Sequence, residues 1–266
     1  MRSSWSAAST SAITSSGLSR PRPDASGRCR LNPEDVIADI EASLQELRTD
    51  RIDLYLLHRD DPSLPVGPLV EVLHAQVRAG KVRAVGASNW TQARLAEANA
   101  WAAQHGLTRW VATSPQFGLA APTRAPWPGC VSLAGPAGAA DVAAVADAKL
   151  AVLCWSPLGG GFFSGRFRKD TPLDSFKTYF ERHTAKTYGS PDNFERLERA
   201  ERFGAERGLS PSQVALAWAL TAPFPAFPII STHSVKSLRE ALEAQRLELT
   251  GRQRQWLDLH TPTAAP

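Results

Sequence analysis

The stretch Ile52-Asp53-Leu54-Tyr55-Leu56-Leu57-His58-Arg59-Asp60-Asp61 decides the fold. It begins with a mostly apolar run that ends on a histidine, and an acidic turn containing Pro62 follows at once. A continuous apolar run bounded by turn residues is typical of a strand buried on both faces, as in a parallel sheet covered by helices. Such sheets carry their chemistry at the carboxyl ends of the strands, which is where His58 stands.

Strands and helices alternate along the chain from Leu31 onward. Asn32 and Pro33 are favoured at helix starts, and a helical spacing of apolar residues then predicts an inward stripe of Ile37, Ile40, Leu44 and Leu47. Short apolar runs predict strands that end at, or just before, His58, Ser88, Gln116, Trp155 and Ser231. Helices are predicted over residues 33–48, 66–79, 91–106, 139–148, 193–207, 210–221, 235–245 and 251–260.

This alternation indicates βαβ units and an α/β fold with a parallel sheet. A doubly wound sheet would favour a Gly-x-Gly-x-x-Gly turn after its first strand, and the chain contains none. A (β/α)8 barrel explains why polar residues stand just past the ends of separate strands, because those ends converge on one face of a barrel. We therefore prefer an incomplete (β/α)8 barrel of the TIM type, with about five recognisable strands.

Composition limits the classes of function. The 266 residues suit one large domain, and the net charge of +4 is spread out without a basic cluster that interleaves with aromatic residues, so nucleic-acid binding has little support. No apolar run approaches the roughly 20 residues that span a membrane. Cys29, Cys130 and Cys154 have no metal-ligand spacing, and Cys154 reads as a small core residue. The expectation is a cytoplasmic protein without a metal site.

Five motifs then resemble the aldo-keto reductases, in particular the branch that includes the potassium-channel β subunits. They are DLYLLHRDDP (53–62), GKVRAVGASNW (80–90), SPQ (114–116), WSPLGGGFFSGRF (155–167) and STHSVKSLREAL (231–242). The resemblance runs from about Leu31 to Leu259. It implies a barrel that binds NADP(H) and reduces small aldehydes or ketones by hydride transfer.

The resemblance also implies roles for single residues. His58 matches the active-site histidine that hydrogen-bonds the substrate carbonyl. The residues expected to hold the nicotinamide are Ser88, Asn89 and Gln116 at its carboxamide and Trp155 stacked on its ring. The pyrophosphate is expected to lie on Ser156, Pro157, Leu158, Gly159 and Gly160 with the cation of Arg166 nearby, as backbone amides and one positive charge suit it. The adenosine end of the cofactor is expected to lie against Ser231, His233, Ser237 and Glu240.

Each role has a plainer alternative. Ser88 and Asn89 are residue types favoured at the start of a helix, Trp155 would also suit core packing, and His58 alone would suit a structural histidine. The combination of motifs in one order favours the functional interpretation.

The family's proton-transfer residues are not found. In the family a tyrosine gives a proton to the carbonyl oxygen, and a lysine paired with an aspartate lowers the pKa of that tyrosine, which otherwise lies near 10. Here the first lysine is Lys81, and the only tyrosine before His58 is Tyr55, inside the strand. Tyr179 and Tyr188 lie far along the chain. The alternative function is therefore a catalytically inactive homologue that acts as a cofactor-binding or interaction module.

The residues before the barrel motifs differ from the rest. Residues 1–30 are rich in Ser and Arg and show no regular period, so we expect an irregular segment followed by a partial barrel domain over 31–261. A transit peptide, a disordered tail or a wrongly assigned start would each give this composition. The first three barrel strands are not recognisable, and a barrel of this kind closes with eight.

Overall fold

The computed structural model describes residues 13–15 and 31–262, which fall into two compact units, Met1–Thr113 and Ser114–Pro266. Three strand pairs of the described residues are parallel: β1 with β2, β2 with β3, and β5 with β6. Parallel pairing needs crossover connections, which the helices between the strands supply. The predicted α/β class is confirmed.

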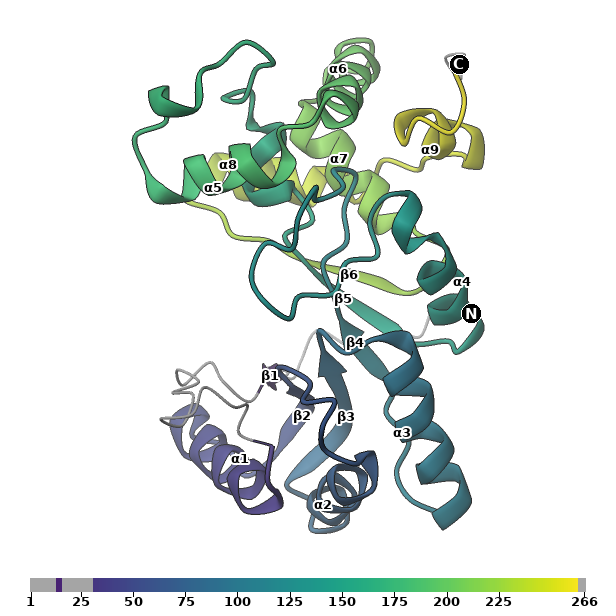
Figure 1. The fold of residues 1–266 in the computed structure, drawn as a ribbon. Coiled ribbons are helices and arrows are strands. Elements are labelled where there is room, and N and C mark those ends of the chain that lie inside the picture. Colours follow the sequence, from purple (N-terminus) through teal and green to yellow (C-terminus); the bar gives the residue numbers. More distant parts are fainter. Residues whose placement is uncertain (1–12, 16–30, 263–266) are drawn as a thin grey trace. The chain divides into compact units, whose positions relative to one another are not determined.

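In the described part of the first unit, the strands β1 (Ile13–Ser15), β2 (Ile52–Leu57) and β3 (Val82–Ser88) follow one another in the sheet. Its helices are α1 (Pro33–Leu47), α2 (Val66–Arg78) and α3 (Gln92–His105). In the register of the pairs, Ile13 lies opposite Leu54 and Leu54 opposite Ala84. Figure 1 shows α1 and α2 next to one another beside these strands. The short strand β4 (Ala112–Ser114) contains the boundary between the units.

Helix ends in the first unit follow local sequence signals. Pro33 occupies the first turn of α1 as predicted, whereas the Asn32 side chain bonds the Asp35 carboxylate at 3.5 Å and does not cap the backbone. Thr91 caps α3 by accepting a hydrogen bond from the Arg94 amide, and Gly106 ends the helix in the left-handed conformation that favours glycine.

The predicted inward stripe of α1 is partly wrong. Ile40 and Leu44 are buried as expected, but Ile37 is 37% exposed and Leu47 is 48% exposed. Val36 is buried in their place, so the inward face runs through residues four apart, Val36, Ile40 and Leu44. Both stripes fit a helical period, and the packing partner decides which residue flanks the centre of the buried face.

Strand β1 was not predicted. Its three residues fall in the segment expected to be irregular, and its backbone pairs with Leu54, Tyr55 and Leu56 of β2. Ile and Thr favour strands, but three residues are too few for an alternating pattern to stand out in a sequence. The remaining expectations for residues 1–30 lie outside the described residues.

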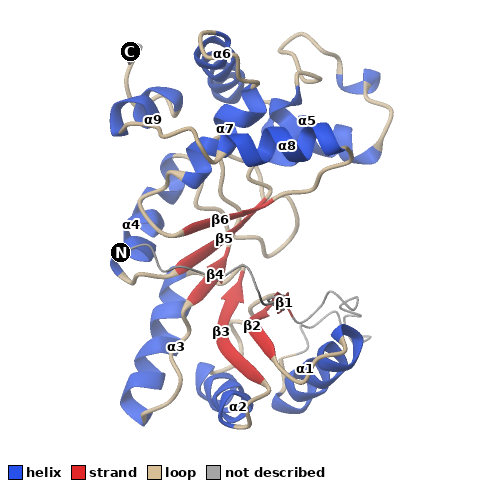
Figure 2. Ribbon diagram, turned by 180° about the vertical axis from the view of Figure 1, so that it is seen from behind, coloured by secondary structure: helices blue, strands red, loops and turns tan. Residues whose placement is uncertain are grey.

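The second unit is built around β5 (Ala151–Trp155) and β6 (Ala226–Ile229), which Figure 2 shows side by side. Three short 3-10 helices lie in its loops: η1 (Pro136–Gly138), η2 (Gly159–Ser164) and η3 (Leu173–Ser175). Its α-helices are α4 (Ala139–Asp147), α5 (Tyr179–Tyr188), α6 (Pro191–Ala205), α7 (Pro211–Leu220), α8 (Val235–Ala244) and α9 (Gly251–Leu257).

The core of the second unit lies along α7, which is buried on every side from Gln213 to Ala219. Ser210 caps this helix, with Pro211 behind it as predicted, and Gln213 completes a capping box. Helix α5 was missed because its aromatic residues Tyr179 and Phe180 are 63% and 72% exposed, so they give no buried stripe to detect.

The structure also tests where the last strand ends and whether Cys154 lies in the core. The last strand ends at Ile229, two residues before the predicted end at Ser231. Cys154 is fully buried in β5, as expected of a core residue, and burial raises the pKa of its thiol to about 12. No helix in residues 13–15 and 31–262 is long and apolar enough to cross a membrane.

Candidate functional site

In the first unit, three predicted site residues lie together at the ends of β2 and β3. His58 follows β2, and Ser88 is the last residue of β3. The Asn89 amide nitrogen donates to the backbone oxygen of His58 at 3.3 Å and to the Ser88 hydroxyl at 3.0 Å. Ser88 and Asn89 are both buried. The side chain of Asn89 thus ties the end of one strand to the end of the next.

Asn89 has a backbone conformation that explains its residue type. Its φ angle of 58° lies in the left-handed region, which asparagine tolerates better than most residues. The cap of the following helix is Thr91. The plainer explanation of Asn89 as a helix cap therefore does not describe its side chain.

His58 is half-buried and has a shifted pKa. Burial is the main cause that lowers its pKa below 6.5, and the positive charge of Arg59 adds to the effect. The imidazole is consequently neutral at neutral pH. A neutral imidazole carries one N–H donor and one acceptor, so it can hydrogen-bond a carbonyl oxygen without acting as a strong acid.

The loop after His58 is held by Arg94 of α3, a residue that the sequence did not point to. Its guanidinium makes a two-point ion pair with Asp60, at 3.1 and 3.2 Å, and donates to the Leu64 backbone oxygen at 2.9 Å. It also lies over the ring of the fully buried Trp90, 5.1 Å from the ring centre. Paired charges of this kind fix geometry, so Arg94 positions the segment that follows His58.

In the second unit, Gln116 lies fully buried just after β4. Its side-chain oxygen accepts a hydrogen bond from the Ser132 hydroxyl at 2.6 Å, whereas its side-chain nitrogen has no acceptor among the described residues. Leaving a buried amide donor unpaired costs about 1–3 kcal/mol. A ligand with a carbonyl or amide oxygen would remove that cost.

Trp155 lies beside Gln116, because its backbone amide donates to the Pro115 oxygen at 3.2 Å. Its ring packs at 5.9 Å against Trp127, and Trp127 stacks at 5.1 Å on His183 of α5. Trp155 keeps partial exposure rather than lying fully in the core. This position therefore has an aromatic face beside an unpaired amide donor.

The loop after Trp155 is rich in glycines in the left-handed conformation. Gly159, Gly160 and Gly161 have φ angles of 58°, 65° and 89°, and Ser156 has a φ angle of 49°. A Cβ atom at Gly160 would lie 2.7 Å from the hydroxyl of Thr184, which donates to the Gly160 backbone oxygen at 3.1 Å. The left-handed φ and the close contact with Thr184 both favour glycine at position 160.

Arg166 lies over this loop. Its Nη2 atom would be 3.5 Å from a Cβ atom at Gly161. The guanidinium also faces the Glu181 carboxylate at 3.5 Å and donates to the Ser164 hydroxyl at 3.2 Å. The side chain is 63% exposed, so its charge remains accessible to an anion on the loop.

A cavity of about 510 Å³ brings together several predicted residues of the second unit. Leu158, Ser231, Ser237 and Glu240 line it, with Ser164 and Gly165 at the end of the glycine-rich loop. Arg166 and His233 do not line it, and His233 is exposed. The loops after β5 and β6, which are far apart in the sequence, thus share one cavity.

The same cavity has lining residues that the sequence did not indicate. Arg168 and Glu201 form an ion pair on its wall, and Thr232 lines it where His233 was expected. The first turn of α7 also lines it, and helix N-termini favour anions. The signal for that turn was present in Ser210 and Pro211, which mark a helix start, but nothing in the sequence links it to the glycine-rich loop.

The tyrosines of the second unit do not supply an obvious proton donor. Burial raises the pKa of Tyr188, so it is a weaker acid than usual, and Tyr179 is 63% exposed on α5. Tyr55 of the first unit is fully buried within β2. Among the residues that the structure describes, no cluster of three or more His, Cys, Asp or Glu side chains could hold a metal ion.

A family model described as "Aldo/keto reductase family" matches residues 22–260. An uncharacterized oxidoreductase of Bacillus subtilis is 30% identical over 79% of this chain and 58% of its own length. A putative voltage-gated potassium channel subunit beta of Schizosaccharomyces pombe is 25% identical over 80% of this chain and 60% of its own length. The predicted resemblance is confirmed, including a relative of the channel-subunit kind.

A solved structure shares the fold. The crystal structure of a thermostable aldo-keto reductase with the inhibitor epalrestat aligns with a TM-score of 0.62 at 20% identity, over 86% of this chain and 67% of that one. The expected barrel-type α/β architecture is confirmed by this similarity. The chain spans about three fifths of the length of the curated relatives it matches.

Proposed function

The chain belongs to the aldo/keto reductase family, and we propose that it binds NADP(H) through its second unit and serves the reduction of small aldehydes or ketones. When bound, NADPH would supply a hydride to the carbonyl carbon. The observation that carries the proposal is the cavity of about 510 Å³ into which the loops after β5 and β6 both open. Cavities of this size suit an organic ligand.

The glycine-rich loop would hold the pyrophosphate. Gly160 packs against Thr184 without room for a side chain, and the backbone amides of this loop would meet the phosphates. Arg166 offers a guanidinium over the loop, and the first turn of α7 contributes the positive end of a helix dipole. Ser156, Pro157, Leu158 and Gly159 complete this loop.

The adenosine would lie between Ser231, Ser237 and Glu240, which line the same cavity. A glutamate and two serines suit the hydroxyl and amino groups of a nucleoside. The preference for NADP over NAD rests on family resemblance, since Ser237 offers no positive charge for a 2′-phosphate. His233 is exposed and lies just before the start of α8 in the sequence.

The nicotinamide would use the unpaired amide donor of Gln116 and the ring of Trp155. A carboxamide oxygen is a suitable acceptor for the Gln116 side chain. Ser88 and Asn89 of the first unit are assigned to the same carboxamide through the resemblance alone. His58, neutral because burial lowers its pKa, would donate a hydrogen bond to the substrate carbonyl.

A second function has its own support in the residues. No lysine precedes Lys81 in the sequence, and Tyr55 is fully buried inside β2. A phenol needs a nearby cation to act as an acid at neutral pH, because its usual pKa is about 10. These residues favour a chain that binds NADP(H) without turning over a carbonyl substrate.

Two measurements on the 266-residue chain separate the functions. Calorimetric titration with NADPH and NADH tests binding, and loss of NADPH absorbance over a panel of small aldehydes and ketones tests turnover. Binding with carbonyl-dependent turnover supports the reductase, and binding without turnover supports the inactive homologue. If neither nucleotide binds, both functions are excluded.

A further inference from the structure

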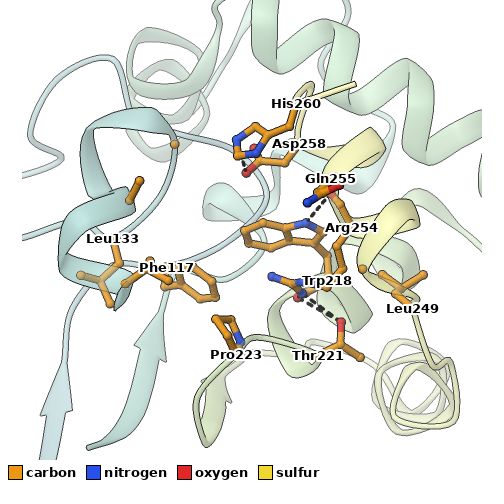
Figure 3. A pocket seen from close by; sticks show the side chains of 14 residues that line it. Phe117, Leu133, Trp218, Thr221, Pro223, Leu249, Arg254, Gln255, Asp258 and His260 are labelled. Carbon is orange, nitrogen blue, oxygen red and sulfur yellow. Dashed lines mark hydrogen bonds and ion pairs between the residues drawn. The ribbon is translucent and has the colours of Figure 1, made fainter. Parts of the chain in front are cut away.

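A second cavity, of about 480 Å³, lies elsewhere in the second unit and shares no lining residue with the first. Figure 3 shows Phe117 and Leu133 on one side and Trp218 on the other, with the polar side chains of Gln255, Asp258 and His260 above them. Trp218 packs against Phe117 with ring centres 5.1 Å apart. The cavity therefore has an apolar wall that includes two aromatic rings.

Arg254 of α9 lines this cavity and is incompletely paired. Its Nη1 atom donates to the Trp218 backbone oxygen and, at 2.9 Å, to the Thr221 hydroxyl, as Figure 3 marks. The N–H groups on Nε and Nη2 have no hydrogen-bond acceptor among the described residues. The guanidinium lies over the Trp218 ring, 4.4 Å from the ring centre. Arg254 is thus held over an aromatic ring, while two of its nitrogens keep N–H groups without a protein acceptor.

No described carboxylate forms an ion pair with Arg254. Asp258, the residue that follows α9, lines the cavity wall, and it pairs with Arg196 at 2.9 Å instead. Asp258 also has His260 at 3.6 Å. Burial lowers the pKa of Arg254 to about 10, partly offset by Asp258, so the guanidinium is still charged at neutral pH. Arg254 is only partly buried, so its N–H groups without a protein acceptor remain accessible to a carboxylate that enters the cavity.

We propose that this cavity binds a small aromatic carboxylate, whose carboxylate group pairs with Arg254 and whose ring lies against the apolar wall that Phe117, Leu133 and Trp218 form. Guanidinium groups match carboxylates in geometry, since two parallel N–H groups meet the two oxygens. A flat ring suits the walls, because aromatic pairs prefer tilted or offset contact at the distances seen between Phe117 and Trp218. The proposal does not depend on NADP(H) binding or on turnover.

The test is a ligand titration of the full 266-residue chain, followed by saturation-transfer NMR. Benzoate is the probe, and benzamide is the neutral molecule of the same shape. Benzoate should bind saturably. Benzamide should bind at least about tenfold more weakly than benzoate, because hydrogen bonds to charged groups contribute about 1.5–3 kcal/mol. Equal binding of the two probes, or saturable binding of neither, overturns the proposal.

Two pairs of variants locate the site. Arg254→Gln should weaken benzoate binding about tenfold or more, whereas Arg252→Gln, on the same helix and outside the cavity, should leave it unchanged. Arg254 also ties α9 to α7, so a thermal melt must accompany that variant.

A second pair of variants fills the cavity and leaves the hydrogen bonds of Arg254 to α7 intact. Ala139→Phe projects from α4 into the cavity, and Ala140→Phe places the same side chain on the exposed neighbour outside it. Loss of benzoate binding in Ala139→Phe alone supports the proposal. Unchanged binding in Ala139→Phe overturns it.

Discussion

The residues that follow the strands have different surroundings in the two units. In Met1–Thr113, the polar residues after β2 and β3 are tied to each other by the Asn89 amide, and Arg94 fixes the loop that follows. In Ser114–Pro266, the residues after β5 and β6 line a cavity. The first arrangement suits a fixed hydrogen-bond donor, and the second suits recognition of a long ligand. Changes in the first unit should therefore alter stability, and changes in the second should alter cofactor affinity.

The units also differ in how their strands are buried. Tyr55 and Leu57 of β2 are fully buried, whereas Phe227 and Ile229 of β6 are each 51% exposed. The second unit builds its core along α7 instead, from Val214 to Ala219. A strand end in the second unit is thus less constrained by packing, which leaves room for a ligand beside it.

The largest expected effect is a loss of stability from Gly86→Ala in the first unit. A Cβ atom at Gly86 would lie 2.1 Å from the backbone oxygen of Ala112, and backbone cannot move aside as a side chain does. We expect the free energy of unfolding to fall by about 3 kcal/mol or more, measured by urea denaturation. Gly80→Ala is the control, because its left-handed φ of 75° is strained but nothing lies within 4 Å. A larger loss in the control would contradict the packing account.

The next effect belongs to the second unit. Gly160→Ala places a Cβ atom 2.7 Å from the Thr184 hydroxyl and should push the glycine-rich loop out of position. We expect NADPH binding to weaken about tenfold, as a steric cost of about 1–3 kcal/mol implies. Gly208→Ala matches the backbone strain, with a φ of 66° and nothing within 4 Å. If both variants bind NADPH equally well, the loop does not hold the cofactor.

Two substitutions of Asn89 should have smaller effects on stability, and they separate the contribution of its side chain from that of its backbone conformation. Asn89→Gly and Asn89→Ala both remove the hydrogen bonds to His58 and Ser88, but only alanine also strains the left-handed φ of 58°. Alanine should therefore lower the free energy of unfolding by about 1 kcal/mol more than glycine does. Equal losses would mean that backbone conformation at Asn89 does not matter.

The smallest expected effect is a pH dependence from His58. Its pKa is lowered in the folded chain, so the unfolded chain takes up the proton first as the pH falls below 6.5. This contribution to stability is present above that pH and is lost as the pH falls toward the folded pKa. His58→Gln should flatten the stability curve in that acidic window, as thermal melts at several pH values would reveal. A curve unchanged by the substitution would contradict the shift.

Most of the strands and the protein family could be predicted from the sequence. Apolar runs ending on polar residues predicted the strands β2 to β6 with their order, because a buried parallel strand leaves a continuous apolar segment. The five motifs predicted the family, which the matched residues 22–260 confirm. Glycines after Trp155 predicted a pyrophosphate-binding loop, which stays a prediction, and their left-handed φ angles explain why glycine stands there.

Other features depend on contacts between distant residues and left no local signal. Arg94 is one of many arginines in the sequence, and only the fold brings it to Asp60 and Trp90. The exposed aromatic residues of α5 obscured a helix that its capping box, Thr178 with Glu181, does support. The unpaired donors of Gln116 and Arg254 depend on which acceptors the fold places near them.

The central claim is that the second unit holds NADP(H) with its nicotinamide on Trp155. Titration of the 266-residue chain with NADPH, followed by tryptophan fluorescence, tests this most directly. We expect saturable quenching, with a smaller amplitude in Trp155→Phe because that ring would lie against the nicotinamide. Absence of saturable quenching, or an amplitude that Trp155→Phe leaves unchanged, would contradict the claim.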